Sequence, residues 1–142
     1  MTNKLIKKVP IHIITAAKEA ALESDCNRLN VGAVIWGWDN SIISSGCNRA
    51  PHNSKYNCKS NGHLIVEGHC IRTVHAETVA ICSNLVYTGL KLLMHVTHTP
   101  CSHCIKMIIE TGIIQLSWGI DYGNAAGALT VLNESQLYWG RV

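Results

Sequence analysis

Hydrophobic residues recur at helical spacing near the start of the chain and then gather in short runs. The spacing over residues 11–28 predicts an opening helix. Two apolar runs flank a segment of Gly, Asp and Asn turn formers and predict a hairpin with strands over 31–36 and 41–46. From residue 73 the pattern becomes regular, and it predicts helices over 73–85, 102–111 and 125–132 and strands over 90–97 and 113–120.

The order of these elements predicts an α/β fold. Strands that alternate with helices favour parallel pairing, with helices on both faces of the sheet. By length, residues 1–142 are expected to form a single domain. Residues 48–69 are rich in Asn, Ser, Gly, His and Lys, and so long a connection in a compact domain is a candidate substrate or metal loop.

Composition narrows the class of protein. Hydrophobic residues make up 47% of the chain and charged residues 15%, so part of the surface is expected to be covered in a homo-oligomer. The sequence has no apolar run of about 18 residues, so we expect no membrane span. The first ten residues lack the apolar core and cleavage site of a secretory signal, so we do not expect secretion. The seven cysteines are an odd number and include a Cys-x-x-Cys, which favours metal binding in a reducing compartment, the cytoplasm. A net charge of +3 suits a phosphorylated substrate and falls short of a nucleic-acid binder.

Two short segments, 75–77 and 100–104, carry the candidate chemistry. His75, Cys101 and Cys104 supply three zinc ligands, and a catalytic zinc typically leaves its fourth position to water. Glu77 is a carboxylate two residues after a ligand and is placed to accept a proton. The alternatives are a structural zinc knot, in which Glu77 has no role, and a thioredoxin-like redox pair, which leaves His75 and Glu77 unexplained.

The same two segments resemble the His-x-Glu and Pro-Cys-x-x-Cys signature of the zinc nucleobase deaminases. The resemblance is to the deoxycytidylate (dCMP) deaminase branch and covers most of residues 10–125. It implies a three-layer α/β/α fold with a mixed five-stranded sheet, in which the first pair of strands is antiparallel and the remainder are parallel. The further segments that carry the resemblance are 31–35, 45–51, 68–77, 97–101 and the pair Asp121-Tyr122.

Function follows from the resemblance as an expectation. It implies a hydrolase that deaminates dCMP to dUMP and ammonia for the dTTP supply: zinc-bound hydroxide attacks C4 of cytosine, and Glu77 shuttles the proton. It also implies a homo-oligomer such as a hexamer, with dCTP and dTTP as effectors. Asn48 could instead hold a turn, and Tyr122 could be an interface aromatic. The implied substrate contacts are Asn48, Ala76, Thr99 and Tyr122.

A second metal site is a further hypothesis. Some deaminases of this branch carry an additional, structural zinc near the corresponding segments, and such an ion would tether the long loop. The alternative is that the cysteines are small buried hydrophobes and the histidines are solvated. Cys47 and Cys82 are expected in the core. The candidate ligands of the second zinc are Cys26, Cys58, His63, His69 and Cys70.

Two positions depart from the family pattern and leave regulation open. Val79 stands where relatives commonly have Asn, and Arg49 stands where many have Gly, so effector control cannot simply be carried over. The alternative functions are a deaminase of dCTP, of deoxycytidine or cytidine, or of single-stranded nucleic acid, and a catalytically silent zinc-binding regulatory subunit. The phosphate-binding residue stays open among Arg28, Arg49, Lys55, Lys59, Arg72 and Lys106.

Overall fold

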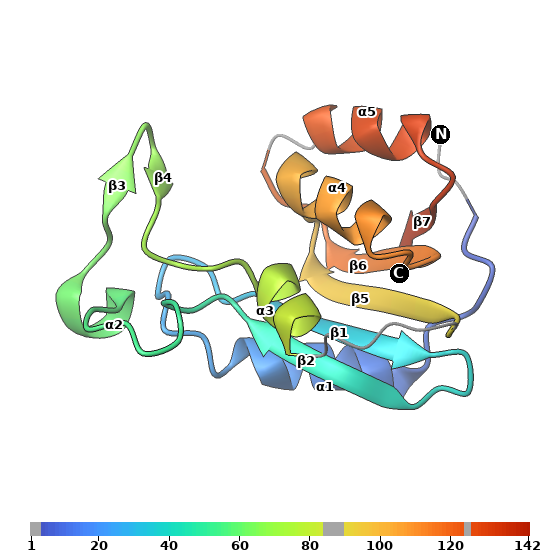
Figure 1. Cartoon of the computed structure of the whole chain (residues 1–142), viewed down its shortest axis with the longest axis horizontal. Coiled ribbons are helices and arrows are strands. Elements are labelled where there is room, and N and C mark those ends of the chain that lie inside the picture. Colours follow the sequence, from blue (N-terminus) through green and yellow to red (C-terminus); the bar gives the residue numbers. More distant parts are fainter. Residues whose placement is uncertain (1–3, 84–89, 124–125) are drawn as a thin grey trace.

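The computed structural model describes residues 4–83, 90–123 and 126–142, in which five strands form one mixed sheet. Helix α1 (Ile11–Ala21) packs on one face, and the three helices named below pack on the other (Figure 1). The expected α/β architecture is therefore confirmed. The sheet order is β2-β1-β5-β6-β7, built from β1 (Gly32–Gly37), β2 (Ile42–Cys47), β5 (Leu92–His98), β6 (Gln115–Ile120) and β7 (Tyr138–Arg141), and the second face carries α3 (Ala76–Cys82), α4 (Ser102–Glu110) and α5 (Ala126–Glu134).

The direction of the strands brings several of their ends to one edge. The pair β1–β2 is antiparallel, and β5, β6 and β7 pair in parallel, as expected. Strand β1 is also antiparallel to β5, with Ala33 opposite Val96. The start of β1 therefore meets the ends of β2, β5 and β6. A hydrogen bond of 3.1 Å from the Gly32 amide to Thr97 Oγ1 closes this edge.

Two glycines let helices approach the sheet closely. A Cβ on Gly32 would overlap the carbonyl oxygen of Ala17 in α1. A Cβ on Gly46 would lie 2.6 Å from the carbonyl oxygen of Ala76, a distance that real Cβ atoms do not adopt. Strand β2 and the first turn of α3 are consequently in direct backbone contact.

The opening helix is shorter than predicted, since it ends at Ala21 instead of residue 28. The polar residues that follow bind main-chain groups elsewhere: Ser24 Oγ donates to the Asn48 carbonyl (2.7 Å), and the Asp25 carboxylate accepts from the Ala50 amide (3.0 Å). These contacts draw the chain away from the helix axis. A helical pattern alone could not reveal this competition.

Other boundaries also differ from the predicted ones. The helix expected from residue 73 begins at Ala76, and residues 84 and 85 of its predicted range lie outside the described residues. Hydrophobic spacing had not indicated β7, which supplies the fifth strand that the resemblance implies. Cys82, expected in the core, is exposed at the end of α3, whereas Cys47 is buried as expected.

The long polar connection contains structure that the pattern did not predict. It holds the short helix α2 (Cys58–Asn61) and a small hairpin of β3 (Ile65–Val66) and β4 (His69–Cys70). In Figure 1 the hairpin projects away from the sheet and its helices. Throughout the described ranges, no helix is both long enough and apolar enough to cross a bilayer.

Candidate active site

Two helix starts bring the predicted metal ligands together. His75 is the N-cap of α3, and Cys101 is the N-cap of α4, with Cys104 one turn further on. His75 Nδ1 lies 3.3 Å from Cys104 Sγ and 3.6 Å from Cys101 Sγ. The three ligand atoms all lie within 4.8 Å of one another. Two thiols and one imidazole in this arrangement match the donors and the count of a zinc site with three protein ligands.

The titration of these groups also suits a cation. Hydrogen bonding from Cys104 and His75 lowers the pKa of Cys101 to about 3, so this thiol is a thiolate at neutral pH. The pKa of His75 is raised, chiefly by its hydrogen bond to Cys101. The pKa of Cys104 is raised because Cys101 beside it carries the charge. One of the three ligands, Cys101, is thus already in the thiolate form that binds a metal ion.

Glu77 stands beside the ligands with its carboxyl group buried. Its side chain is 4% exposed, and burial raises the pKa of the carboxyl. It occupies the first turn of α3, two residues after His75, and its side chain lies near Cys104. A buried carboxyl with a raised pKa beside a metal site is typical of a group that takes up and releases protons.

The ligands open onto a cavity of about 580 Å³. This volume falls in the range that holds a small-molecule ligand. Its walls come from the segment before β1, the end of β2, the hairpin, the starts of α3 and α4, and the segments after β6. The four predicted substrate residues all line it: Asn48, Ala76, Thr99 and Tyr122.

Asn48 has its side-chain amide engaged with the main chain. Its Oδ1 accepts from the Val31 amide (2.8 Å), and its Nδ2 donates to the Leu29 carbonyl (2.7 Å). The side chain is 8% exposed. Asn48 therefore fastens the segment before β1 and caps no turn after β2 with these bonds, while its contact with a sugar stays a prediction.

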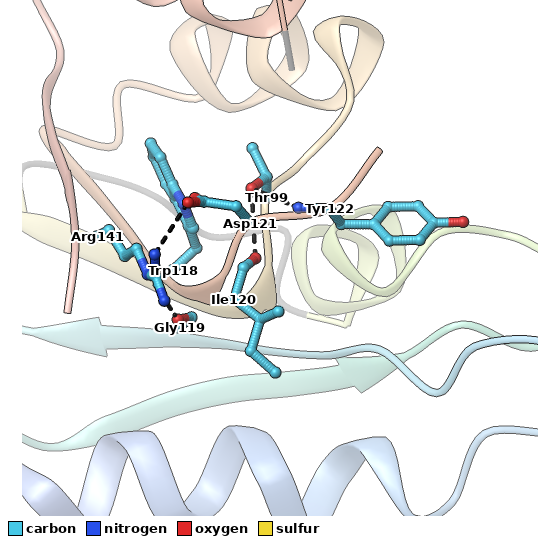
Figure 2. Close-up of polar contacts among 7 residues, drawn as sticks. All are labelled: Thr99, Trp118, Gly119, Ile120, Asp121, Tyr122 and Arg141. Carbon is cyan, nitrogen blue, oxygen red and sulfur yellow. Dashed lines mark hydrogen bonds and ion pairs between the residues drawn. The ribbon is translucent and has the colours of Figure 1, made fainter. Parts of the chain in front are cut away.

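Tyr122 is held by the end of β5. The Tyr122 amide donates to Thr99 Oγ1 (3.2 Å), and the Thr99 amide donates to the Ile120 carbonyl (2.9 Å). The ring of Tyr122 is exposed and meets the His98 ring edge-on, 6.1 Å between centroids. The exposed ring thus lines the edge of the cavity. In Figure 2 the Tyr122 side chain points away from the turn that carries it.

A second set of contacts fixes the same turn from β7. The Asp121 carboxylate accepts from Trp118 Nε1 (2.9 Å) and from Arg141 Nη1 (3.0 Å), and Arg141 Nε donates to the Gly119 carbonyl (3.2 Å) (Figure 2). Sequence reasoning missed Trp118 and Arg141. Arg141 is distant in sequence from its partner Asp121, and Trp118 reaches Asp121 only because the chain turns between them. The motif pair Asp121-Tyr122 was therefore the one feature of the sequence that pointed to this turn.

A second cluster of ligand-type residues lies at the base of the hairpin. The ligand atoms of Cys26, Cys58 and His63 lie within 4.8 Å of one another. Cys70 Sγ is 3.5 Å from Cys58 Sγ. The Nδ1 atom of His63 is buried and has no hydrogen-bond partner among the described residues. A metal ion would satisfy this atom, so Cys26, Cys58 and His63 fit a metal site, with Cys70 beside Cys58. His69 is exposed and lines the cavity instead.

The thiols of this cluster have divergent pKa values. Burial and the neighbouring Cys70 raise the pKa of Cys58 to about 12. Burial would raise the pKa of Cys70 as well, but hydrogen bonds from the backbone at Arg72 and Leu64 and from the His63 side chain hold it at about 6. The cluster therefore carries a thiolate near neutral pH, as a cation site requires.

The two departures from the family pattern line a separate cavity of about 480 Å³ between α1, β2 and α3. Arg49 and Val79 face it, together with Glu19 and Glu23. The main chain of Arg49 pairs with Val74, directly before His75. One lining residue of this cavity is thus paired with the residue that precedes His75.

Comparisons with known proteins agree with this geometry. Residues 8–120 match the family model of the cytidine and deoxycytidylate deaminase zinc-binding region. The chain is 39% identical to ComE operon protein 2 of Bacillus subtilis over 104 residues, 72% of this chain and 54% of that protein. It is 32% identical to the probable deoxycytidylate deaminase of Caenorhabditis elegans over 120 residues, 79% of this chain and 57% of that protein. The chain thus spans about half the length of the curated relatives it matches.

A solved structure shares the fold. The dCMP deaminase of cyanophage S-TIM5, in complex with dCMP and dUMP, matches with a TM-score of 0.76. The match covers 93% of this chain and 94% of that chain, at 24% sequence identity. At this level of identity the likeness concerns the fold.

Proposed function

Because the chain belongs to the cytidine and deoxycytidylate deaminase family, we propose that it hydrolyses dCMP to dUMP and ammonia. The observation that carries this proposal is the convergence of His75, Cys101, Cys104 and the buried Glu77 on one cavity of nucleotide size. The names of the nematode relative and of the cyanophage structure support dCMP as the substrate.

His75 Nδ1 and the thiolates of Cys101 and Cys104 would hold a zinc ion. Bound there, the ion acts as a Lewis acid that lets a water molecule ionise near neutral pH. The protein contributes orientation: the two helix starts fix the three ligands, and the Arg49–Val74 backbone pairing fixes the approach to His75.

Glu77 moves the protons of the reaction. Its carboxylate accepts a proton from water and delivers it to N3 of the cytosine ring as the hydroxyl adds to C4. It then takes the proton of that hydroxyl and passes it to the amino group, which leaves as ammonia as the C4 carbonyl forms. Burial keeps the pKa of this carboxyl above its usual range, closer to the pH at which it must work in both directions. The main chain at Ala76 and Thr99 would read the base edge.

The same proposal includes the further features that the resemblance implies. These are a homo-oligomer such as a hexamer, a cytoplasmic location and nucleotide effectors, for which the cavity beside Arg49 and Val79 is a candidate region. A second, structural zinc at Cys26, Cys58, His63 and Cys70 also belongs to it.

The direct test is an absorbance assay of cytosine-to-uracil conversion. Zinc-loaded wild type and Glu77→Gln are compared on dCMP, dCTP, deoxycytidine and single-stranded DNA. We expect turnover of dCMP, and a fall of roughly 10²–10⁴-fold in kcat for Glu77→Gln with zinc content unchanged. No turnover of any substrate would identify a silent subunit. Undiminished turnover by Glu77→Gln would contradict the proton shuttle.

A further inference from the structure

Two thiols lie side by side at the base of the hairpin. Cys58 Sγ and Cys70 Sγ are 3.5 Å apart. The sulfur–sulfur bond of a disulfide is about 2.05 Å long, so the two atoms need to approach by only about 1.5 Å. Rotation of the two side chains can supply a movement of this size. The pair is therefore within reach of a disulfide.

Local hydrogen bonds set the position of each thiol. The side chain of Asn57 accepts from the Ser60 amide (2.8 Å) and caps α2, the helix that Cys58 begins. Cys70 lies opposite Ile65 in the pairing of β3 with β4. These contacts all lie inside the projecting segment, and none of them involves the central sheet. The two thiols therefore face each other through short-range structure.

The two thiols differ in their access to solvent. Cys70 is partly exposed and lines the cavity of about 580 Å³. Cys58 is 2% exposed and is not among the residues that line this cavity. A small oxidant in the cavity therefore meets Cys70 first. This is the arrangement of one thiol that is oxidised and a second, buried thiol that resolves the product.

We propose that Cys58 and Cys70 form an oxidation site, at which a peroxide joins them in a disulfide and thereby detaches the hairpin from Cys26. A hydroperoxide oxidises the Cys70 thiol to a sulfenic acid and is itself reduced to an alcohol, or to water when it is hydrogen peroxide. The Cys58 thiol then attacks this sulfur, so the S–S bond forms and the S–O bond breaks. The hydroxyl leaves as water with the proton of the Cys58 thiol. Two electrons pass from the two thiols to the peroxide.

The disulfide competes with the second metal, so the inference rests on that part of the proposed function. The ligand atom of Cys58 lies within 4.8 Å of those of Cys26 and His63. A sulfur atom that is bonded in a disulfide is no longer a thiolate ligand. Cys26 and His63 alone fall short of the four ligands of a structural zinc. Oxidation would therefore release the metal and, with it, the connection between the hairpin and Cys26.

This connection matters because it joins two walls of the main cavity. One wall includes Cys26, in the segment before β1, whose amide donates to Ser24 Oγ (3.1 Å). The other wall includes Gly68, His69 and Cys70 of the hairpin. A metal bound by the second cluster links the two walls, whereas the disulfide links residues on the hairpin side alone. Oxidation should therefore loosen the cavity and weaken substrate binding.

The test treats the zinc-loaded full chain with hydrogen peroxide and follows its thiols by mass spectrometry. We expect the loss of two hydrogen atoms per chain, a pair of peptides linked through Cys58 and Cys70, and the release of one zinc ion per chain. A thiol reductant with added zinc should reverse all three changes. Cys70→Ser should release no zinc at the same dose of peroxide. Cys82→Ser, which changes an exposed cysteine outside both clusters, should behave as wild type.

The mass spectra separate this inference from the proposed function. A link from Cys58 to Cys26, or a link between Cys101 and Cys104 alone, would overturn the oxidation site, and neither result bears on turnover of dCMP by the untreated protein. A link between Cys58 and Cys70 without release of zinc would overturn the detachment of the hairpin. An untreated chain without dCMP turnover would contradict the proposed substrate and leave the disulfide to be judged by mass alone.

The consequence for the cavity is measured separately. We expect oxidation of wild type to raise KM for dCMP roughly 3- to 10-fold, because the substrate must then order the loosened wall. The same treatment of Cys70→Ser should leave KM unchanged, which excludes oxidation of the active-site cysteines as the cause. An unchanged KM in oxidised wild type would overturn the link between the disulfide and the cavity.

Discussion

The two clusters of cysteine and histidine described in this chain lie on secondary-structure elements that differ in length and in packing against the core. His75 and Cys101 cap α3 and α4, which pack against the central sheet. Cys58 opens a four-residue helix, His63 lies shortly before the two-residue strand β3, and Cys70 ends the two-residue strand β4. The first cluster is held by the core whether or not a metal binds. The second lies in a segment with little core of its own.

The residues beside the two clusters also differ in burial. Beside the first, Ala76 and Glu77 are buried, whereas on the hairpin Leu64, Ile65 and Val66 are each about half exposed, at 46%, 49% and 47%. An isolated two-stranded hairpin is marginally stable in water. We infer that a metal at the first cluster serves chemistry and that a metal at the second serves the order of the hairpin.

The largest expected effect is the loss of activity in Cys101→Ser. Removing a thiolate whose pKa is about 3 deprives the cation of its strongest charge partner, so deamination should fall to the background of the assay. The far-ultraviolet circular dichroism should be unchanged, because the sheet and helices carry α4. Cys82→Ser, which changes an exposed cysteine outside both clusters, is the matched control. A variant that unfolds would contradict the view that the core holds this cluster.

Cys58→Ser should affect the hairpin before it affects chemistry. We expect bound zinc to fall from two ions per chain to one, and limited proteolysis within residues 58–70 to become faster, because the metal no longer ties this segment to Cys26. Turnover of dCMP should fall less than in Cys101→Ser. Zinc analysis and mass spectrometry of the fragments measure both effects. An unchanged zinc content in Cys58→Ser would show that the second cluster does not bind zinc through Cys58.

A third effect concerns the core on the α1 face. The His95 ring is 1% exposed, burial lowers its pKa to about 4, and its Nδ1 lies 2.9 Å from Ser117 Oγ. The unfolded chain takes up a proton near pH 6.5, so folding stability should be lost as pH falls from 6.5 towards 4, by roughly 3 kcal/mol at most. His95→Gln removes this titration.

The measurement is urea unfolding of both proteins with chelator present, so that metal release does not contribute. The midpoint of wild type should fall more steeply between pH 7 and pH 4.5 than that of His95→Gln. Equal slopes would show that His95 does not set the acid sensitivity of the core.

The smallest effect is expected from Arg141→Ala. Arg141 and Asp121 are exposed at 59% and 60% of their side chains, so the ion pair contributes at most about 1 kcal/mol. Through the turn that carries Tyr122, its loss should raise KM for dCMP up to about fivefold and leave kcat unchanged. In a Tyr122→Ala background the same substitution should have no further effect on KM. An independent effect there would separate Arg141 from Tyr122.

Local signals identified the three ligand-type residues that the fold brings together, and contacts between distant segments account for what the sequence did not indicate. The residue types and spacing of His75, Cys101 and Cys104 indicate metal ligands, and the starts of α3 and α4 bring their ligand atoms together. The end of the opening helix could not be predicted, because Ser24 and Asp25 find partners more than twenty residues away.

The same reason applies to other features that the sequence did not indicate. The role of the Asn48 amide depends on Leu29 and Val31, which the sequence does not mark as partners. Strand β7 follows a loop and pairs only with β6, so its four residues give too short an alternation to recognise.

The contact of Gly46 with the start of α3 has a consequence for how this protein can diverge. Because the helix that carries Glu77 rests on bare backbone, its height above the sheet is fixed by main-chain dimensions and not by the size of interlocking side chains. Neighbouring core positions are then free to exchange one apolar residue for another over time. Position 46 is not, since any side chain there would push the first turn of α3, and with it Glu77, away from the sheet.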